Sequence, residues 1–209
     1  YMPGMGGNFK LGLISGEKSK WLTAADKIVA SWCCDRMSYT IYDSLLQNGR
    51  VDVKVVPCPN KDGMIVYVDF TNIPAGVQLA WAFGGATGRR FSRDGDIGAD
   101  PESSFYLQPE YCKGNEYAIQ DSSFVLTYGA TDNRKQISGV FPGNSSIKIV
   151  DPQQQQNPRS LLSSENLVTP AIAGNMPVVA DEVYFFLVQS GKVDKNDQSS
   201  IGDQYRWTG

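Results

Sequence analysis

The sequence has no histidine among its 209 residues. Histidine is the side chain whose ordinary pKa lies closest to neutral pH, and it is the commonest metal ligand in proteins. Its absence excludes Ser-His-Asp and Cys-His catalysis within this chain. Only carboxylate chemistry, or a nucleophile with a lysine or tyrosine base, stays open.

Cysteine is scarce, and its spacing is uninformative for metal binding. The four cysteines are Cys33, Cys34, Cys58 and Cys112. Adjacent cysteines do not fit the Cys-x-x-Cys pattern of redox and zinc sites, and no second cluster follows at zinc spacing. We expect buried or unpaired thiols, with one disulfide, involving Cys112, as the alternative.

The chain also lacks long apolar runs and a strong net charge. No apolar segment approaches the roughly 18 residues of a membrane span. The net charge of −3 with mixed signs gives no electrostatic case for a nucleic acid or an anionic membrane as partner. The first residue is Tyr1 rather than methionine, so we expect that an upstream segment has been removed.

Apolar and polar residues alternate with period two through most of the chain, which predicts strands. The length suits one all-β domain that buries roughly 70% of its unfolded surface. Short strands that recur with turn residues between them favour an antiparallel two-sheet sandwich with little helix. Asn48-Gly49 is typical of a two-residue hairpin. The expected strands are 10–14, 27–32, 37–42, 51–55, 64–70, 77–83, 116–119, 123–128, 136–141, 146–150 and 181–189.

One segment, residues 84–115, breaks this pattern. It follows an apolar strand and carries many glycines and charges, with neither helical nor alternating periodicity. Loops of this length inside a compact domain are usually functional or disordered. We therefore divide the chain into a sandwich domain, residues 1–191 with the long loop 84–115, and a polar connection, residues 192–209, toward a further domain.

The charged residues of this loop offer several kinds of site, and none is singled out. Asp94, Asp96 and Asp100 could form an irregular calcium site, although Ala99 and Phe105 stand where an EF-hand needs glycine and glutamate. A salt-bridge network of these carboxylates with nearby arginines is the simpler interpretation. A catalytic carboxylate pair lacks a defined spacing. The glycines do not fit a phosphate loop, and we expect no cofactor.

Aromatic side chains flank the loop, a mixture that suits sugar rings as well as a domain interface. Trp81 is either such a residue or an inward core residue of its strand. The candidates for carbohydrate or domain-interface contacts are Trp81, Arg89, Arg90, Arg93, Asp94, Asp96, Asp100, Glu102 and Tyr106. We assign no catalytic residue.

Two segments carry a family resemblance: YMPGMGGNFKLGL at the start and WAFGGATGRRFSRDGDIGADPESSFYLQPEYCKGN from Trp81. They resemble the amino-terminal region of an uncharacterised family of large secreted proteins from polysaccharide-degrading bacteria. The resemblance implies a galactose-mutarotase-like supersandwich followed by a helical (α/α)₆ toroid of glycoside-hydrolase type. It also implies a periplasmic or exported setting.

We therefore expect an accessory sandwich domain whose partner is a helical catalytic domain of the same polypeptide, with loop 84–115 at the interface or lining the sugar cleft. The alternative is an autonomous carbohydrate-binding module. This chain alone is not expected to be an enzyme, whereas its parent protein is expected to be a glycoside hydrolase.

Overall fold

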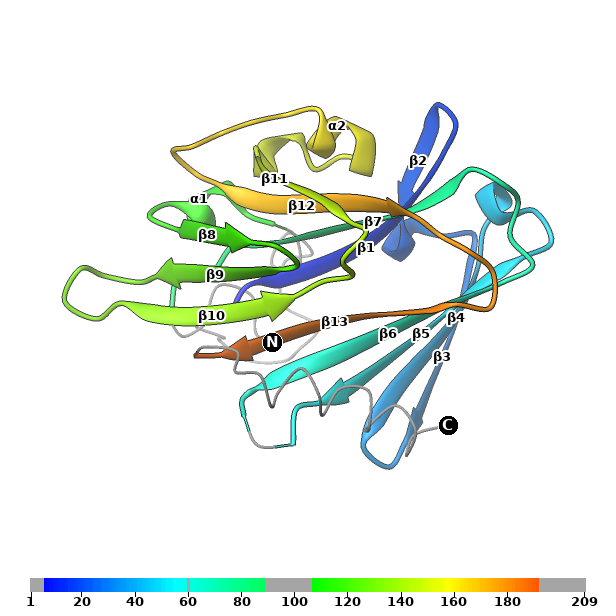
Figure 1. The fold of residues 1–209 in the computed structure, drawn as a ribbon, viewed down its shortest axis with the longest axis horizontal. Helices are drawn as coiled ribbons and strands as arrows, with labels where there is room; N and C mark the ends of the chain where they lie inside the picture. Colours follow the sequence, from blue (N-terminus) through cyan, green and yellow to red (C-terminus); the bar gives the residue numbers. More distant parts are fainter. Residues whose placement is uncertain (1–5, 60, 89–106, 192–209) are drawn as a thin grey trace, which may run out of the picture.

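The computed structural model describes residues 6–59, 61–88 and 107–191, which fold into a sandwich of two antiparallel sheets (Figure 1). The five-stranded sheet has the order β11 (Ser146–Val150), β12 (Ala171–Pro177), β7 (Val77–Gly84), β1 (Asn8–Ser15) and β2 (Lys18–Trp21). The eight-stranded sheet has the order β3 (Lys27–Cys33), β4 (Arg36–Tyr42), β5 (Arg50–Pro57), β6 (Gly63–Thr71), β13 (Val183–Ser190), β10 (Lys135–Val140), β9 (Ser123–Tyr128) and β8 (Glu116–Gln120). The predicted all-β sandwich is confirmed.

Helical segments are short and lie in the connections between strands. They are η1 (Leu22–Ala24), η2 (Ser44–Leu46), α1 (Pro109–Cys112), η5 (Pro152–Gln154) and α2 (Pro158–Leu162). No helix in the described part of the chain is long and apolar enough to cross a membrane.

The core forms where the inward residues of both sheets meet. On β6, Val66, Val68 and Phe70 face the five-stranded sheet, because side chains alternate between the two faces of a strand. From the other side, Trp81 packs on Phe186 of β13, with ring centroids 5.8 Å apart. This alternation is the physical reason that a period-two sequence gives a two-layer fold.

Two strands and one turn differ from the sequence prediction. β2 and β12 were not predicted. In β12, Gly174 weakens the strand pattern, but the structure needs it, because a Cβ there would lie 2.3 Å from the backbone oxygen of Ser146. The two-residue hairpin predicted at Asn48-Gly49 is wrong: β4 and β5 are joined by residues 43–49, in which Asp43 caps η2 by accepting a bond from the Leu45 amide at 2.9 Å.

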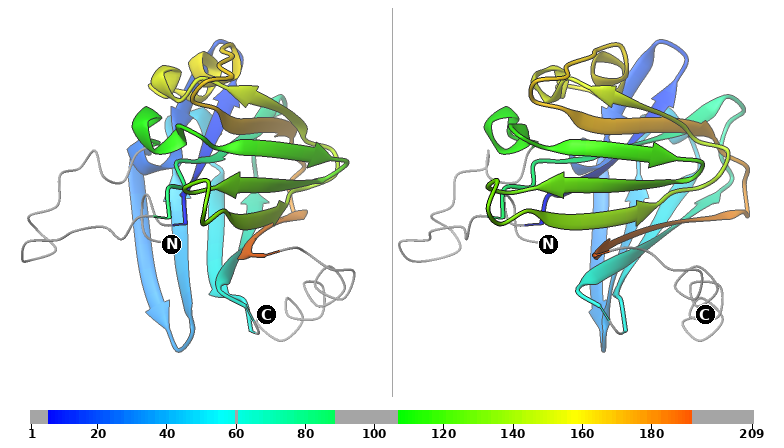
Figure 2. Two further views of the ribbon diagram at one scale, coloured as in Figure 1. Left: turned by 90° about the vertical axis from the view of Figure 1, so that its left-hand side faces the viewer. Right: turned by 60° about the vertical axis from the view of Figure 1, so that its left-hand side comes forward.

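The outer face of the five-stranded sheet is covered by the segments around α1, η5 and α2 (Figure 2). Trp21, Ala82, Val150 and Leu161 form a second apolar cluster there. This layer also encloses Lys10, whose side chain points outward from β1.

The eight-stranded sheet is the wider of the two. Its β3–β4 end extends past β1 and β2, and β3 is exposed along all seven residues. Figure 2 shows this hairpin projecting from the body of the sandwich. One end of the inner face is therefore only partly covered by the opposite sheet.

Candidate functional site

The described ends of loop 84–115 are fixed firmly to the sandwich. Asn115 is buried, and its side-chain amide donates to the backbone oxygen of Ala86 at 2.7 Å and accepts from the Ala86 amide at 3.4 Å. These two bonds close the loop across 29 residues. Ala86 and Leu107, which lie on either side of residues 89–106, are both fully enclosed. The loop therefore starts and ends on rigid supports.

A glutamine that is distant in the sequence completes this support. Gln155 accepts a bond from the Leu107 amide at 2.9 Å and donates one to the Leu107 carbonyl oxygen. Its own backbone oxygen accepts from the Trp21 indole at 2.7 Å. The sequence analysis did not identify Gln155 as part of the site. A single sequence holds no signal that pairs positions 48 residues apart.

Only one of the candidate contact residues lies within the described part of the chain. Trp81 is 1% exposed and packs against Phe141 at 5.0 Å between ring centroids, with its indole donating to Ser145 at 3.4 Å. The structure places it as an inward core residue, the second of the two interpretations that the sequence left open. Its ring faces are not accessible to a sugar in this conformation.

The other candidates lie outside the described residues, as does the calcium alternative at Asp94, Asp96 and Asp100. They are Arg89, Arg90, Arg93, Asp94, Asp96, Asp100, Glu102 and Tyr106. Among the residues that the structure does describe, no group of three or more Cys, Asp or Glu side chains is placed to hold a metal ion.

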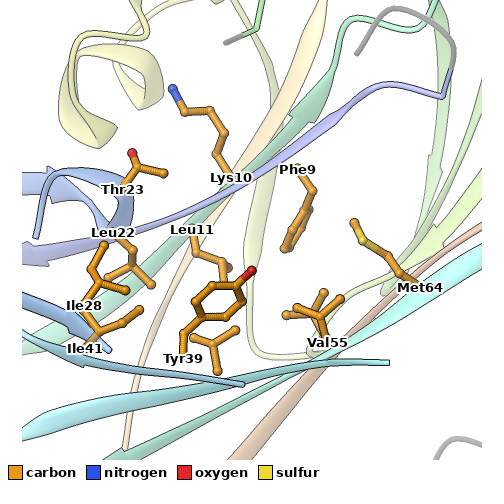
Figure 3. A pocket seen from close by; sticks show the side chains of 12 residues that line it. Phe9, Lys10, Leu11, Leu22, Thr23, Ile28, Tyr39, Ile41, Val55 and Met64 are labelled. Atoms are coloured by element: carbon orange, nitrogen blue, oxygen red, sulfur yellow. The ribbon is translucent and has the colours of Figure 1, made fainter. Parts of the chain in front are cut away.

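An apolar hollow of about 490 Å³ opens between β1 and the β3–β6 end of the eight-stranded sheet (Figure 3). Phe9 and Leu11 line it from β1, whereas Tyr39, Val55 and Met64 line it from the other sheet. Aliphatic and aromatic side chains make up most of its wall. The complete lining is Phe9, Lys10, Leu11, Leu22, Thr23, Ile28, Tyr39, Ile41, Val53, Val55, Met64 and Val66.

The hollow suits an apolar occupant better than a sugar. Carbohydrate sites need polar groups around the hydroxyls, but Thr23 and Tyr39 carry the only hydroxyl groups of this lining. Figure 3 shows the Lys10 amine directed away from the apolar side chains. Tyr39 and Ile41 alternate with polar residues along β4. This pattern predicts that the two side chains share an inward face, but it does not predict that the opposite sheet leaves this part of the face uncovered.

Lys10 is a buried charged residue beneath the segments that cover the outer face of the five-stranded sheet. Its amine lies 4.5 Å from the centre of the Trp21 ring and donates to Gln155 at 3.4 Å. Only 7% of the residue is exposed. Burial lowers the pKa of Lys10 to about 8, because the charged form loses hydration there.

A second hollow, of about 400 Å³, has a polar wall. Its lining includes Glu17, Lys18 and Asn157, and the complete set is Glu17, Lys18, Ser19, Lys20, Ser44, Leu45 and Asn157. Lys20 forms an ion pair with the buried Asp43 carboxylate at 2.7 Å at its edge. Carboxylate, amine, hydroxyl and amide groups together can both donate to and accept from sugar hydroxyls.

None of the four cysteines, all of which lie in the described part of the chain, forms a disulfide in the structure. Cys33 and Cys34 are exposed at the turn between β3 and β4, with their sulfur atoms 3.4 Å apart. Cys112 is fully enclosed at the end of α1, and burial raises its pKa to about 12. The alternative of a disulfide at Cys112 is therefore not formed in this structure.

Comparison with solved structures finds the crystal structure of a bacterial glucoamylase complexed with acarbose. The similarity has a TM-score of 0.56 at 9% sequence identity, and it covers 91% of this chain and 27% of that chain. At this identity it shows the fold alone. This chain thus spans about a quarter of the length of the glucoamylase. No curated protein matches the sequence.

A family model matches nearly the whole sequence, from residue 2 to residue 205. Its description is "Domain of unknown function (DUF4450)". Apart from Tyr1, the matched range includes both segments that carry the resemblance described above. The chain belongs to the DUF4450 family.

Proposed function

We propose that this chain is the accessory β-sandwich domain of a glycoside hydrolase that degrades polysaccharide outside the cytoplasm, in the periplasm or after export. In this proposal the sandwich is a supersandwich of the galactose-mutarotase type, and it packs on a helical catalytic domain of the same polypeptide. Loop 84–115 forms the contact and lines part of the sugar cleft.

One observation carries this proposal: the fold similarity to a glucoamylase covers 91% of this chain but only 27% of the glucoamylase. A domain that matches a fraction of an enzyme, and that has no histidine and no defined carboxylate pair of its own, is better suited to support catalysis than to perform it. The hydrogen bonds that hold the two ends of loop 84–115 favour the same accessory role. Asn115 and Gln155 hold its ends on the sandwich, so that the groups between them start from fixed positions.

The test measures polysaccharide hydrolysis by the complete polypeptide and by residues 1–209 alone. Residues 89–104 are replaced by a short Gly-Ser link, which keeps the Ala86 and Leu107 supports. We expect the isolated chain to be inactive, and the replacement to lower kcat/KM of the complete polypeptide at least tenfold. The control replaces residues 130–133, the exposed β9–β10 turn, in the same way. Unchanged kcat/KM after the loop replacement would refute the role of the loop.

The polar hollow favours a second candidate function, an autonomous carbohydrate-binding module. Titration calorimetry of residues 1–209 with α-glucan oligosaccharides or acarbose tests it. Binding there should weaken on Glu17→Gln, because the Glu17 carboxylate is exposed and can accept from sugar hydroxyls. Glu165→Gln, an exposed carboxylate elsewhere, is the matched control. Trp81→Ala is a poor test, because it removes a core side chain. Absence of heat across the panel excludes this candidate.

A further inference from the structure

The β3 edge of the eight-stranded sheet is built like a pairing surface. β3 is the terminal strand of that sheet, and within the described residues no strand lies along its outer side. All seven of its residues are exposed. Ile28 is 42% exposed, Val29 48% and Trp32 67%, so three large apolar side chains gather on one strand.

Natural proteins usually protect such an edge. Proline, inward-pointing charges, bulges or very short strands discourage another chain from pairing with it. β3 has the sequence KIVASWC, with no proline and with its one charge, Lys27, at the end. An unprotected, regular edge of this length is a site for strand addition.

The geometry of the hairpin determines which backbone groups are free. Cys34 and Asp35 form a two-residue turn that closes on the pair Cys33–Arg36. Hydrogen-bonded and non-hydrogen-bonded pairs alternate from such a turn along an antiparallel ladder. The N–H and C=O groups of Ile28, Ala30 and Trp32 therefore point away from β4, toward the open edge.

We propose that β3 pairs antiparallel with β3 of a second copy of this chain, centred on Ala30. A hydrogen-bonded pair requires outward backbone groups on both strands. Centring on Ala30 sets Ala30 opposite Ala30 and Ile28 opposite Trp32 in both directions. Any other centre with the same parity leaves at least one of these residues without a partner. The contact is self-complementary about a two-fold axis, as a closed dimer needs.

The side chains support the same register. Ile28, Ala30 and Trp32 lie on the inner face, in register with Ile41, Tyr39 and Met37 of β4. Ile28 lines the apolar hollow, and the register sets Trp32 of the second copy directly opposite it. The most exposed tryptophan of the described residues thus lies at the rim of the partner's hollow. Aromatic and β-branched residues are favourable cross-strand pairs.

Charge is also compatible with this arrangement. Lys27 begins β3, and the turn at the other end carries Asp35, followed by Arg36. Antiparallel pairing brings Lys27 of each copy next to the turn of the other, so the arrangement avoids opposing two lysines. A strand pair with one aromatic contact on each side buries an area at the low end of specific interfaces, and we expect a reversible dimer with a dissociation constant on the order of micromolar.

Sedimentation equilibrium of residues 1–209 over increasing concentration tests the dimer. The mass should rise from 22.9 kDa toward twice that value. Ala30→Pro should lower the association constant of the dimer at least tenfold, because it removes an outward N–H group that does not bond to β4. Leu167→Pro, at an exposed residue elsewhere, is the control. A constant 22.9 kDa mass at all concentrations refutes the proposal.

The register is tested by exchanging the cross-strand pair. Ile28→Lys and Trp32→Glu should each weaken the dimer, whereas the double variant should recover it, because lysine and glutamate then face each other at both ends. Circular dichroism confirms that each variant is folded. Failure of the double variant to recover association refutes this register.

Cross-linking gives a readout that does not depend on affinity. In a Cys33→Ser, Cys34→Ser background, Ala30→Cys should form a disulfide-linked dimer under mild oxidation, since paired Cα atoms about 5.5 Å apart suit a disulfide. Ser31→Cys, its neighbour on the other face, should not. Equal cross-linking at both positions, or none at Ala30→Cys, overturns the proposal. None of these results depends on the polysaccharide activity.

Discussion

Replacing Lys10 by methionine should stabilise the fold at pH 7 and lose this advantage in alkaline solution. In the folded state Lys10 is 7% exposed, and its pKa is lowered from 10.5 to about 8 by burial. The unfolded chain keeps the ordinary value. The folded state therefore binds the Lys10 proton more weakly than the unfolded state does.

The sign and size follow from proton linkage. Below pH 8 both states carry the proton, and folding buries a poorly hydrated charge. Between pH 8 and 10.5 only the unfolded state carries it, so wild-type stability rises with pH, by about 1.4 kcal/mol per pH unit. Lowering the pKa from 10.5 to about 8 corresponds to about 3 kcal/mol in total. Lys10→Met removes this cost while keeping an unbranched apolar stem.

Urea unfolding of both proteins from pH 7 to pH 11 measures the difference. Lys10→Met should be more stable by about 3 kcal/mol at pH 7 and nearly equal to wild type above pH 10.5. Other titrating groups are present in both proteins and cancel. Lys18→Met, at an exposed residue, should change little at any pH. A stability difference that stays constant from pH 7 to pH 11 would show that burial of the Lys10 charge is not its cause.

Three further predictions concern other parts of the fold. Gly174→Ala should cost about 2–4 kcal/mol in urea unfolding, because a methyl group meets backbone there, whereas Gly143→Ala, with open space around it, should be near neutral. Asp43→Asn should cost about 1–3 kcal/mol, because it weakens the bonds that the buried carboxylate accepts from the Lys20 amine and the Leu45 amide, although Lys20 keeps its ion pair with Asp26. In native protein at pH 8, iodoacetamide should label Cys33 and leave Cys112 unmodified until urea is added, since burial raises the Cys112 pKa to about 12; equal labelling would contradict that burial.

The sequence predicts the sandwich well because alternation is a local property. Residues 64–70, for example, alternate between the core and the outer face, and β6 forms where the pattern places it. β12 escapes prediction because Gly174 lowers its strand propensity, although the same glycine lets Trp81 and β11 approach it closely. One sequence shows the strand propensity of a residue, but it does not show which distant residues pack against that position and require a glycine there.

The candidate site was harder to predict for the same reason. The loop 84–115 is visible in the sequence, but the amides that hold its ends, Asn115 and Gln155, are ordinary polar residues until their distant partners are known. Trp81 shows the converse: an aromatic residue beside a suggestive loop turned out to belong to the core. A side chain that precedes a loop in the sequence is not necessarily exposed to solvent.

The apolar hollow and the exposed β3 edge have one origin, the unequal widths of the two sheets. Eight strands face five, so the inward residues of β3 and β4 extend beyond the cover that β1 provides. Alternation alone would make the uncovered half of the inner face as apolar as the covered half. The structure agrees, because Ile28 lies in the same cross-strand row as Phe70, and Tyr39 in the same row as Val68. Exposed positions tolerate polar residues, so the apolar residues on the uncovered part of this face are informative. In the proposed dimer, pairing along the β3 edge surface joins the apolar rows of the two copies and sets Trp32 of one copy beside the hollow of the other. Ala30→Pro addresses that surface without touching the loop, so association and polysaccharide hydrolysis can fail independently and each proposal stands on its own measurement.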